Sequence, residues 1–209
     1  MNLTVMLFRH GRTAWNHQRR FLGSTDIGLD EVGWSQARGL ADRTGASLAA
    51  VYSSPLARAR ETASCLADNV VELANLRELA QGDLEGLKFG EALERYATFF
   101  QRWREDPTDV GPPGGETLGS CRDRGLAALA AIVDRHGDGD VVGAVSHQLV
   151  IGSVTCTMAG APLSEWSRFG VGNCDGVLLK WDGVNWQIAG QLLIGSDLII
   201  APGSIAPDV

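Results

Sequence analysis

The chain is poor in cysteine, and its four cysteines lie far apart. Cys65, Cys121, Cys156 and Cys174 form no CxxC pair, and a disulfide framework is not expected in a chain of this length. We interpret them as free thiols, with Cys65 and Cys121 buried because they fall in helical patterns. Free thiols are typical of a reducing compartment, so we expect the cytoplasm as the location.

Long hydrophobic runs are also absent. No apolar stretch approaches the roughly 20 residues that a helix needs to span a bilayer. Met1 leads directly into an apolar strand pattern, and no basic segment followed by a long apolar run precedes it, so no signal peptide is visible. We therefore expect a soluble, intracellular protein.

The chain lacks an excess of positive charge. It has 18 Lys and Arg against 25 Asp and Glu, which gives a net charge of −7. This balance argues against nucleic acid and anionic membranes as partners. Against that acidic background, four arginines gather near the N-terminus: Arg9, Arg12, Arg19 and Arg20. Such a local cluster favours a small anionic ligand.

What the chain does contain is an ordinary globular composition. Of its 209 residues 44% are hydrophobic and 21% are charged, which predicts a folded domain with a substantial core. We expect a single domain over 1–195, with an irregular insertion or lid at about 78–115. Residues 196–209 are expected to be a C-terminal tail of uncertain order, because two prolines interrupt them.

Strand and helix patterns alternate along the chain. Apolar runs predict six strands, at Leu3–Phe8, Ala49–Ser53, Val70–Leu73, Asp140–Val145, Val177–Trp181 and Trp186–Leu193. Helical spacing predicts helices after an Asp30 cap and up to Gly45, after a Ser54 cap with Pro55 in the first turn, over Glu116–His136 and over Leu149–Met158. The polar segment Trp15–Leu29 is interpreted as a functional loop. Alternation of this kind indicates an α/β fold with a mostly parallel central sheet and helices on both faces.

Chemically suggestive residues follow the strands. In α/β proteins ligands bind beyond the carboxyl ends of the sheet strands, and a histidine between arginines, beside a glycine, suits an anionic substrate. An isolated Arg-His-Gly is more typical of a capping loop with solvated arginines. Here, however, polar residues occur in four segments, each where a predicted strand ends or a helix or irregular segment begins. They are Arg9-His10-Gly11, Ser53 to Arg60, Leu76-Arg77-Glu78 and Val145-Ser146-His147.

Taken together, these segments resemble the histidine phosphatase superfamily, also called the phosphoglycerate mutase-like clan. Five motifs occur in the family's order from about Leu3 to Trp186: RHG at Arg9-His10-Gly11, SSPLxRAxxTA at Ser53 to Ala63, LRE…GDxEG at Leu76-Arg77-Glu78 and Gly82 to Gly86, PPGGE at Pro112 to Glu116, and a second histidine at His147. The resemblance implies a three-layer αβα sandwich with a phosphoglycerate mutase-like sheet.

The resemblance also implies catalytic roles. His10 resembles the nucleophile that forms a phosphohistidine intermediate. Arg9, Arg58 and His147 would surround the phosphoryl group, and Glu78 occupies the position of the proton donor. No metal and no other cofactor are expected, because arginines and histidines supply the positive charge.

Further contacts to substrate are expected from six residues: Asn16, Arg12, Arg20, Leu22, Gly23 and Gln148. Two of them depart from the family's pattern, which usually has Glu or Gln at Arg12 and Gly at Gln148. We expect these two changes to alter the choice of substrate and not to abolish turnover. Arg12 and Arg20 also suggest a second acidic group on the substrate.

Several roles have alternatives. Arg58 can instead pair with a carboxylate such as Glu61 or Glu78, and His147 can be a satisfied structural histidine. Asp83 and Glu85 are rival proton donors. A zinc site of His10, His147 and a carboxylate has no support from spacing, and the flanking arginines would repel a cation.

The function expected from the resemblance is hydrolysis of a small phosphorylated metabolite by the phosphatase-type branch, with a metal-independent mechanism. Phosphoryl transfer of the phosphoglycerate mutase type is the alternative within the family. A non-catalytic module that binds a phosphorylated ligand is the alternative outside enzymes. A homodimer is compatible with the sequence, which does not define the oligomeric state or the substrate.

Overall fold

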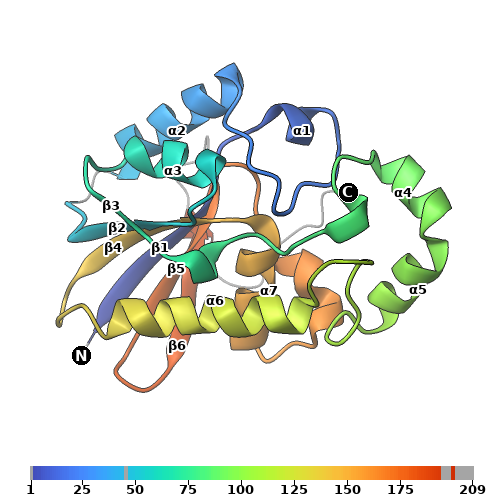
Figure 1. Ribbon diagram of the computed structural model, residues 1–209. Coiled ribbons are helices and arrows are strands. Elements are labelled where there is room, and N and C mark those ends of the chain that lie inside the picture. The colour runs from blue at the N-terminus through green and yellow to red at the C-terminus, as the bar shows by residue number, and fades with distance from the viewer. Residues whose placement is uncertain (1, 45–46, 194–198, 201–209) are drawn as a thin grey trace.

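A computed structural model describes residues 2–44, 47–193 and 199–200 of the chain (Figure 1). Its centre is a seven-stranded sheet with the strand order β3-β2-β4-β1-β5-β6-β7. In chain order the strands are β1 (Leu3–Arg9), β2 (Ala50–Ser53), β3 (Val70–Glu72), β4 (Val141–Ser146), β5 (Gly176–Trp181), β6 (Trp186–Leu192) and β7 (Ile199–Ile200).

The first four strands of this order, β3, β2, β4 and β1, are parallel to one another. β5 pairs antiparallel with β1 and forms a hairpin with β6, as the apolar runs on either side of Asp182-Gly183 predict. β1 therefore lies between β4 and β5, and its last residues, Phe8 and Arg9, pair with Val145 and Ser146. This register brings the residues that follow β1 and β4 to the same edge of the sheet.

Helices surround the sheet. The α-helices are α1 (Ala14–His17), α2 (Glu31–Thr44), α3 (Ala57–Ser64), α4 (Phe89–Arg95), α5 (Ala97–Glu105), α6 (Leu118–Val133) and α7 (Gln148–Met158). Three short 3₁₀ segments are η1 (Ala74–Leu76), η2 (Gly82–Leu84) and η3 (Leu163–Phe169).

Side chains of β1 alternate between two helical layers, as the geometry of a strand requires. Leu3, Val5 and Leu7 join a buried cluster that includes residues of α6 and α7. Phe8 points the other way and packs with Leu40 of α2. In Figure 1, α2 and α3 lie above the sheet and α6 and α7 lie below it. The predicted three-layer αβα sandwich with a mostly parallel central sheet is confirmed.

Helix boundaries agree with the sequence patterns at some caps and differ at others. Asp30 caps α2 as predicted, because its Oδ1 accepts the N–H of Gly33 at 2.8 Å; the predicted end at Gly45 lies outside the described residues. The expected Ser54 cap is wrong, since α3 begins at Ala57 and Leu56 holds the cap position. The hydroxyl of Ser54 accepts the N–H of Leu56 at 3.3 Å and lies 2.8 Å from Nε2 of His147.

The predicted helix over Glu116–His136 is shorter in the structure. Thr117 ends the irregular segment by accepting the N–H of Ser120 with its hydroxyl at 3.1 Å, so that α6 starts at Leu118. The Trp15–Leu29 segment is largely a loop, although it contains most of α1, which Thr13 caps. The starts of both helices are set by local Thr caps that hydrophobic spacing does not reveal, and α6 ends at Val133.

The segment of about 78–115 contains α4 and α5, which lie to one side of the sheet (Figure 1). Aromatic rings from this segment and the α1 loop contact one another in series. Centroid distances are 5.9 Å for Phe21–Phe89, 5.8 Å for Phe21–Phe100, 4.9 Å for Phe99–Phe100 and 5.5 Å for Phe99–Trp103. We call these five residues the aromatic cluster. Movement of this segment as a lid remains a prediction.

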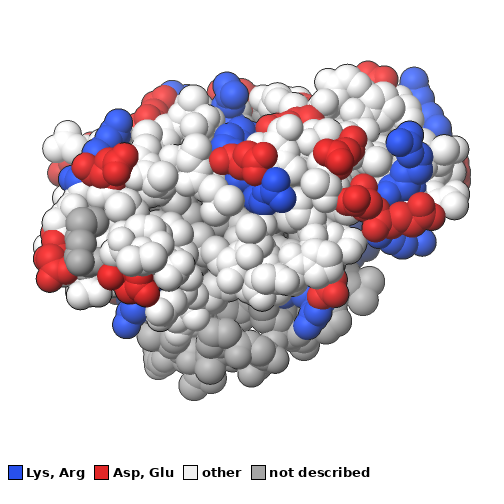
Figure 2. All heavy atoms as spheres, turned by 90° about the horizontal axis from the view of Figure 1, so that it is seen from below, with Lys and Arg blue, Asp and Glu red and all other residues white. Residues whose placement is uncertain are grey.

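The four cysteines are free thiols, as predicted, although Cys65 is only partly buried. Within the expected tail, Ile199–Ile200 pairs antiparallel with β6, and the tail's other residues lie outside the described ranges. No helix among the described residues has the length and apolar character to cross a membrane. On the face shown in Figure 2, acidic and basic side chains are interspersed around a largely uncharged centre.

Candidate active site

The loop that follows β1 requires a glycine. A Cβ atom on Gly11 would lie 2.6 Å from the carbonyl oxygen of Gly33, at the start of α2. The close approach lets α2 pack against the loop, while the N–H of His10 donates to the carbonyl of Ser146 at 3.1 Å. Asn173 also donates to the carbonyl of His10 at 3.0 Å. His10 is thus held from both sides of β1.

The ring of His10 presents one nitrogen as a base. Its Nδ1 lies 2.7 Å from the carbonyl oxygen of Gly11, which can only accept, so Nδ1 carries the proton and Nε2 carries the lone pair. The residue is 3% exposed. Burial, followed by the charges of Arg58 and Arg9, lowers the pKa of His10 well below its usual value. The lowered pKa therefore favours the neutral imidazole, whose Nε2 carries the lone pair.

His147 follows β4 and lies beside His10, with ring centroids 5.1 Å apart. Its Nε2 is 2.8 Å from the hydroxyl of Ser54, and its buried Nδ1 has no partner among the residues that the structure describes. Burial and the charge of Arg58 lower the pKa of His147 well below the usual value. The unpartnered Nδ1 argues against the alternative of a satisfied structural histidine.

Arg58 comes from the first turn of α3 and is fully buried. Its guanidinium donates to the carbonyls of Thr25 and Gly23, at 2.9 and 2.8 Å. The alternative pairing with Glu61 is not observed, because that carboxylate accepts the N–H of Leu29 instead, at 2.6 Å. Burial lowers the pKa of Arg58 to about 10, and the side chain stays positively charged at neutral pH.

Arg9 ends β1 and donates from Nη1 to the carbonyl of Val171 at 2.9 Å. Burial lowers the pKa of its guanidinium. The buried side-chain atoms without a partner in the described part of the chain are Nε of Arg9, Nε of Arg58 and Nδ1 of His147. An unsatisfied buried group costs about 1–3 kcal/mol. All three belong to the predicted phosphoryl-binding group, and an anion is the ligand that such groups favour.

Glu78 lies after η1 and is 8% exposed. Its carboxyl accepts the backbone N–H of Leu79 at 2.9 Å and of Leu149 at 3.4 Å. Burial raises the pKa of Glu78 although these hydrogen bonds and Arg58 oppose it. A buried carboxyl with a raised pKa is suited to hold and deliver a proton.

The two rival proton donors lie in different surroundings. Glu85 accepts the N–H groups of Ser24 and Thr25 and the hydroxyl of Thr25, and these hydrogen bonds lower its pKa. It is therefore a carboxylate at neutral pH. Asp83 is exposed. Neither lines the cavity beside His10, whereas Glu78 does.

A cavity of about 550 Å³ opens beside His10. Seven of the predicted site residues line it: Arg9, His10, Asn16, Arg20, Leu22, Glu78 and Gln148. Asn16 accepts from the N–H and the hydroxyl of Thr13 with its Oδ1, which leaves the Nδ2 hydrogens as donors. Arg58 and His147 are fully buried and do not themselves line the cavity.

Two predicted substrate contacts are placed elsewhere. Arg12 forms an ion pair with Asp30, Nε to Oδ2 at 2.9 Å, and does not line the cavity. Gly23 holds Arg58 through its carbonyl, and a Cβ atom on it would lie 2.5 Å from Glu85. The expectation that Arg12 adds a cation beside the pocket is therefore wrong in this structure, and Gly23 supports the site indirectly.

The sequence does not indicate which residues form the wall of the cavity beyond His10 and the other predicted site residues. The wall is formed by the aromatic cluster, several further apolar side chains, Gln81 and Arg104. Helical spacing of Phe99, Phe100 and Trp103 signals an apolar face, but it does not indicate what that face covers. Arg104 is exposed and has no carboxylate partner among the described residues.

The described lining contains one carboxyl, that of Glu78, and three arginines, Arg9, Arg20 and Arg104. The positive side chains and the cavity they surround fit an anionic ligand. Within the described ranges, no three His, Cys, Asp or Glu side chains are grouped as a metal site would require.

A mostly parallel sheet between two helical layers, with a histidine and arginines at its carboxyl edge, defines an α/β enzyme of the phosphoglycerate mutase-like class. The sequence model of the histidine phosphatase superfamily (branch 1) matches residues 5–191. The chain belongs to the histidine phosphatase superfamily.

Named relatives agree with this assignment. The chain is 34% identical to phosphoserine phosphatase 1 of Hydrogenobacter thermophilus, over 81% of this chain and 82% of that protein. It is 35% identical to a metal-independent phosphoserine phosphatase of Arabidopsis thaliana, over 72% of this chain and 66% of that one. Among solved structures, YhfR of Bacillus stearothermophilus superposes with a TM-score of 0.82 at 31% identity, over 90% of this chain and 95% of that one. The protein is a phosphatase, and the relatives support small phosphorylated metabolites as its substrates.

Proposed function

We propose that the protein hydrolyses phosphate monoesters through a phosphohistidine intermediate on His10. Nε2 of His10 attacks phosphorus, the bond from phosphorus to the alcohol oxygen breaks, and Glu78 gives its proton to that oxygen. Water then attacks phosphorus and breaks the bond to Nε2, while the carboxylate of Glu78 takes up a proton from the water. Inorganic phosphate leaves, and both side chains return to their starting states.

The hydrogen bond between the buried ring of His10 and the carbonyl of Gly11 is the observation that carries this proposal. The Nδ1–H of His10 is fixed on that carbonyl at 2.7 Å, and the pKa of the ring is lowered. A cationic imidazole has no lone pair with which to attack phosphorus. Burial and two neighbouring arginines therefore supply the neutral ring that a nucleophile requires.

The positive charge of the site supports a mechanism without a metal ion. Arg9 lines the cavity, whereas Arg58 and His147 are buried outside its lining with one unpartnered nitrogen each; we propose that all three donate toward the phosphoryl oxygens, on which negative charge develops in the transition state. Asn16 contributes amide hydrogens at the cavity wall. One relative bears the name of a metal-independent phosphatase, which agrees with this proposal.

The shape of the cavity favours a substrate with a bulky apolar part. When a phosphate group is bound at His10, the part of the cavity that it does not fill is lined by the aromatic cluster. Aromatic side chains favour apolar and flat groups. Arg20 and Arg104, in place of the predicted Arg12 and Arg20 pair, favour a second acidic group on the substrate. Equal kcat/KM for an ester with a carboxylate tail and its neutral counterpart, at low ionic strength, would exclude that second group.

A phosphoglycerate mutase-type transfer is the alternative in the same family. The same His10 and Glu78 serve both reactions, so the geometry near phosphorus does not separate them. Incubation with 3-phosphoglycerate, with and without 2,3-bisphosphoglycerate, distinguishes the two: hydrolysis releases phosphate, whereas a mutase yields an isomer. A module that only binds a phosphorylated ligand is disfavoured, because the nucleophile and the acid are both present with suitable pKa shifts. A homodimer remains a prediction.

The decisive experiment removes the nucleophile. His10→Ala is expected to lower kcat for p-nitrophenyl phosphate by about 10³-fold or more, since the covalent step is lost. A rapid quench of the wild type with labelled substrate should yield acid-labile label on His10. His136→Gln is the matched control, because that histidine binds Tyr52 and Asp140 outside the cavity. Undiminished turnover by His10→Ala, or label on another residue, would refute the mechanism.

A further inference from the structure

The PPGGE stretch, Pro112 to Glu116, has no role in the chemistry proposed above, although it packs against the segment that carries Glu78. The N–H of Asp83 donates to the carbonyl of Pro113, and the N–H of Glu116 donates to the carbonyl of Ala80, both at 2.9 Å. A Cβ atom on Gly115 would lie only 2.4 Å from the same carbonyl oxygen of Ala80. The two segments are thus in direct backbone contact.

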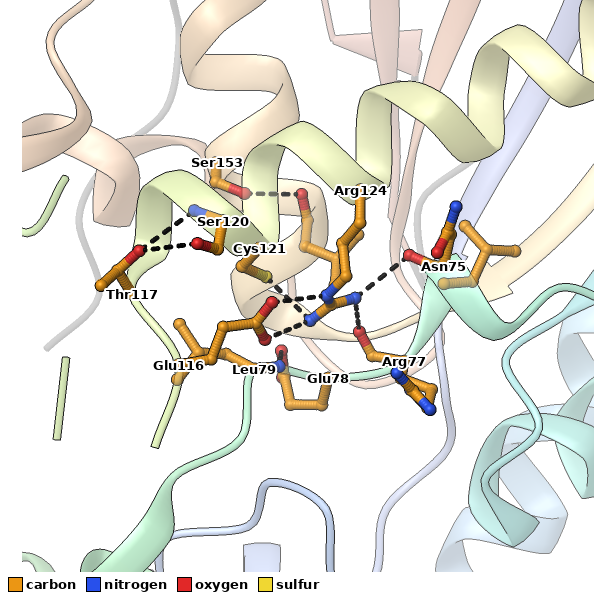
Figure 3. A network of polar contacts seen from close by, with 12 residues as sticks. Asn75, Arg77, Glu78, Leu79, Glu116, Thr117, Ser120, Cys121, Arg124 and Ser153 are labelled. Carbon is orange, nitrogen blue, oxygen red and sulfur yellow. Dashed lines mark hydrogen bonds and ion pairs between the residues drawn. The ribbon is translucent and has the colours of Figure 1, made fainter. Parts of the chain in front are cut away.

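Arg124 of α6 connects the same stretch to the other side of Glu78 (Figure 3). Its Nε and Nη2 donate to the two carboxylate oxygens of Glu116, each at 2.8 Å. Its Nη1 donates to the carbonyl of Asn75 at 3.1 Å and to the carbonyl of Arg77. Nη2 also lies 3.3 Å from Sγ of Cys121. Every N–H of the guanidinium therefore has a partner.

These contacts flank the proton donor. Arg77, whose carbonyl Arg124 holds, directly precedes Glu78, and Ala80, whose carbonyl Glu116 holds, lies two residues after it. The described hydrogen bonds to the Glu78 carboxyl come from backbone N–H groups, those of Leu79 and Leu149. The direction of that carboxyl consequently depends on how the backbone around it is fixed.

On the basis of the proposed function, we propose that Arg124 and Glu116 are positioning residues that aim the carboxyl of Glu78 at the leaving oxygen. Neither residue lines the cavity. Their ion pair is bidentate and largely shielded, with Arg124 14% and Glu116 22% exposed at the side chain, and such charge-assisted forks are geometrically specific. A displacement of a catalytic group by about 1 Å is sufficient to slow a reaction by about 100-fold.

Two substrates of similar shape separate a positioning role from a general loss of structure. Phenyl phosphate needs a proton on its leaving oxygen, whereas dinitrophenyl phosphate leaves as a stable anion. We expect Arg124→Gln to lower kcat/KM for phenyl phosphate by about tenfold or more, within the range that general acids contribute. For dinitrophenyl phosphate kcat/KM should change by less than about threefold, because no proton transfer is lost. Arg124→Lys should not restore phenyl phosphate hydrolysis, since an ammonium lacks the planar fork.

Arg122→Gln is the matched control on the same helix, because that arginine pairs only with the neighbouring Asp123 among the described residues. It should leave both substrates unaffected. The double variant Arg124→Gln with Glu78→Gln completes a cycle with the two single variants. If Arg124 acts through Glu78, the double variant should hydrolyse phenyl phosphate no more slowly than Glu78→Gln alone. Glu116→Gln keeps the side-chain shape and repeats the test should Arg124→Gln fail to fold.

Equal losses on the two esters, or additive losses in the double variant, would overturn the positioning role. Failure of the proposed function gives a different result: Glu78→Gln itself would then hydrolyse phenyl phosphate as well as the wild type does. A leaving-group effect in Glu78→Gln that is absent from both Arg124→Gln and Glu116→Gln leaves Glu78 as the acid and refutes only its positioning by this pair.

Discussion

His10 and Glu78 have pKa shifts of opposite sign with one leading cause. Burial disfavours the charged form of each, which favours the neutral imidazole of His10 and the protonated carboxyl of Glu78. The proposed first chemical step needs both of these states together. In water the carboxyl loses its proton at a lower pH than the imidazole does. Burial of both groups therefore favours the pair of a neutral imidazole and a protonated carboxyl.

The pH dependence of kcat/KM should follow from these two groups. As pH falls through the lowered pKa of His10, the ring gains a proton and loses its nucleophilic lone pair, so the rate decreases below that pKa. As pH rises through the raised pKa of Glu78, the acid is lost and the rate decreases above it. We expect a bell-shaped profile for phenyl phosphate, after correction for ionisation of the substrate, with its acid limb below the usual pKa of histidine.

Glu78→Gln should remove the alkaline limb, since an amide does not titrate. With dinitrophenyl phosphate the wild type should also lack that limb. Survival of the alkaline limb in Glu78→Gln would assign it to another group and would contradict the role of Glu78 as the acid.

The close contact of Gly11 with Gly33 leads to a second prediction. A methyl group there would meet the carbonyl of Gly33 at 2.6 Å, so Gly11→Ala must displace either the His10 loop or α2. We expect a loss of about 1–3 kcal/mol in the free energy of unfolding, as is typical of overpacking, together with a lower kcat. Urea unfolding and p-nitrophenyl phosphate assays measure the two effects.

Gly39 on α2 provides the matched control, because a Cβ atom on it would meet nothing within 4 Å. Gly39→Ala should be neutral or more stable by up to about 1 kcal/mol, owing to the helix propensity of alanine. If both variants behaved alike, close packing of Gly11 on Gly33 would not be what positions His10.

At the scale of elements, α5 is notable because it has no buried residue, although Phe99, Phe100, Trp103 and Arg104 all line the cavity. Trp103 packs against a core cluster, and the rest of the apolar face of α5, Phe99 and Phe100, lines the cavity. Substrate choice should therefore be altered by changes in α5 with little effect on the free energy of unfolding.

Phe99→Ala tests this expectation. Phe99 contacts Phe100 and Trp103 in the aromatic cluster. The variant should lower kcat/KM for naphthyl phosphate about tenfold, the usual scale of a lost apolar contact. Because this contact is uniform binding, the change should appear in KM with kcat nearly unchanged. For glycerol phosphate, which cannot reach the cluster with an apolar group, kcat/KM should stay unchanged.

Phe169→Ala serves as the control, since that phenylalanine lies in η3 and does not line the cavity. Equal changes on the naphthyl and glycerol esters would argue against a substrate-binding role for the cluster.

At the scale of the whole molecule, the parts that the sequence predicts are those that depend on short-range patterns. The alternation of strands and helices predicts the sandwich, and the carboxyl ends of parallel strands bring His10 and His147 together by topology alone. The His–Arg chemistry at those ends follows from the same reasoning.

The parts that the sequence does not predict depend on long-range contacts of irregular backbone. The ion pair of Arg12 with Asp30 crosses from the loop to α2, and residue spacing does not reveal it. Arg104 reaches the cavity only because α5 folds beside it. Likewise, the guanidinium of Arg124 binds Glu116 and the backbone before Glu78, and it joins segments up to 49 residues apart. No periodic pattern in the sequence predicts such a pairing.

The order of strands has a consequence for biosynthesis. β1 leaves the ribosome well before its two sheet neighbours, β4 and β5, which begin at Val141 and Gly176. Such distant pairing is slow to form because a long loop must close first. The emerging chain must therefore keep the apolar strand β1 unpaired until β4 has been translated. His10 and His147 can meet only after that closure, so a chain translated only as far as β3 does not yet hold the complete proposed site.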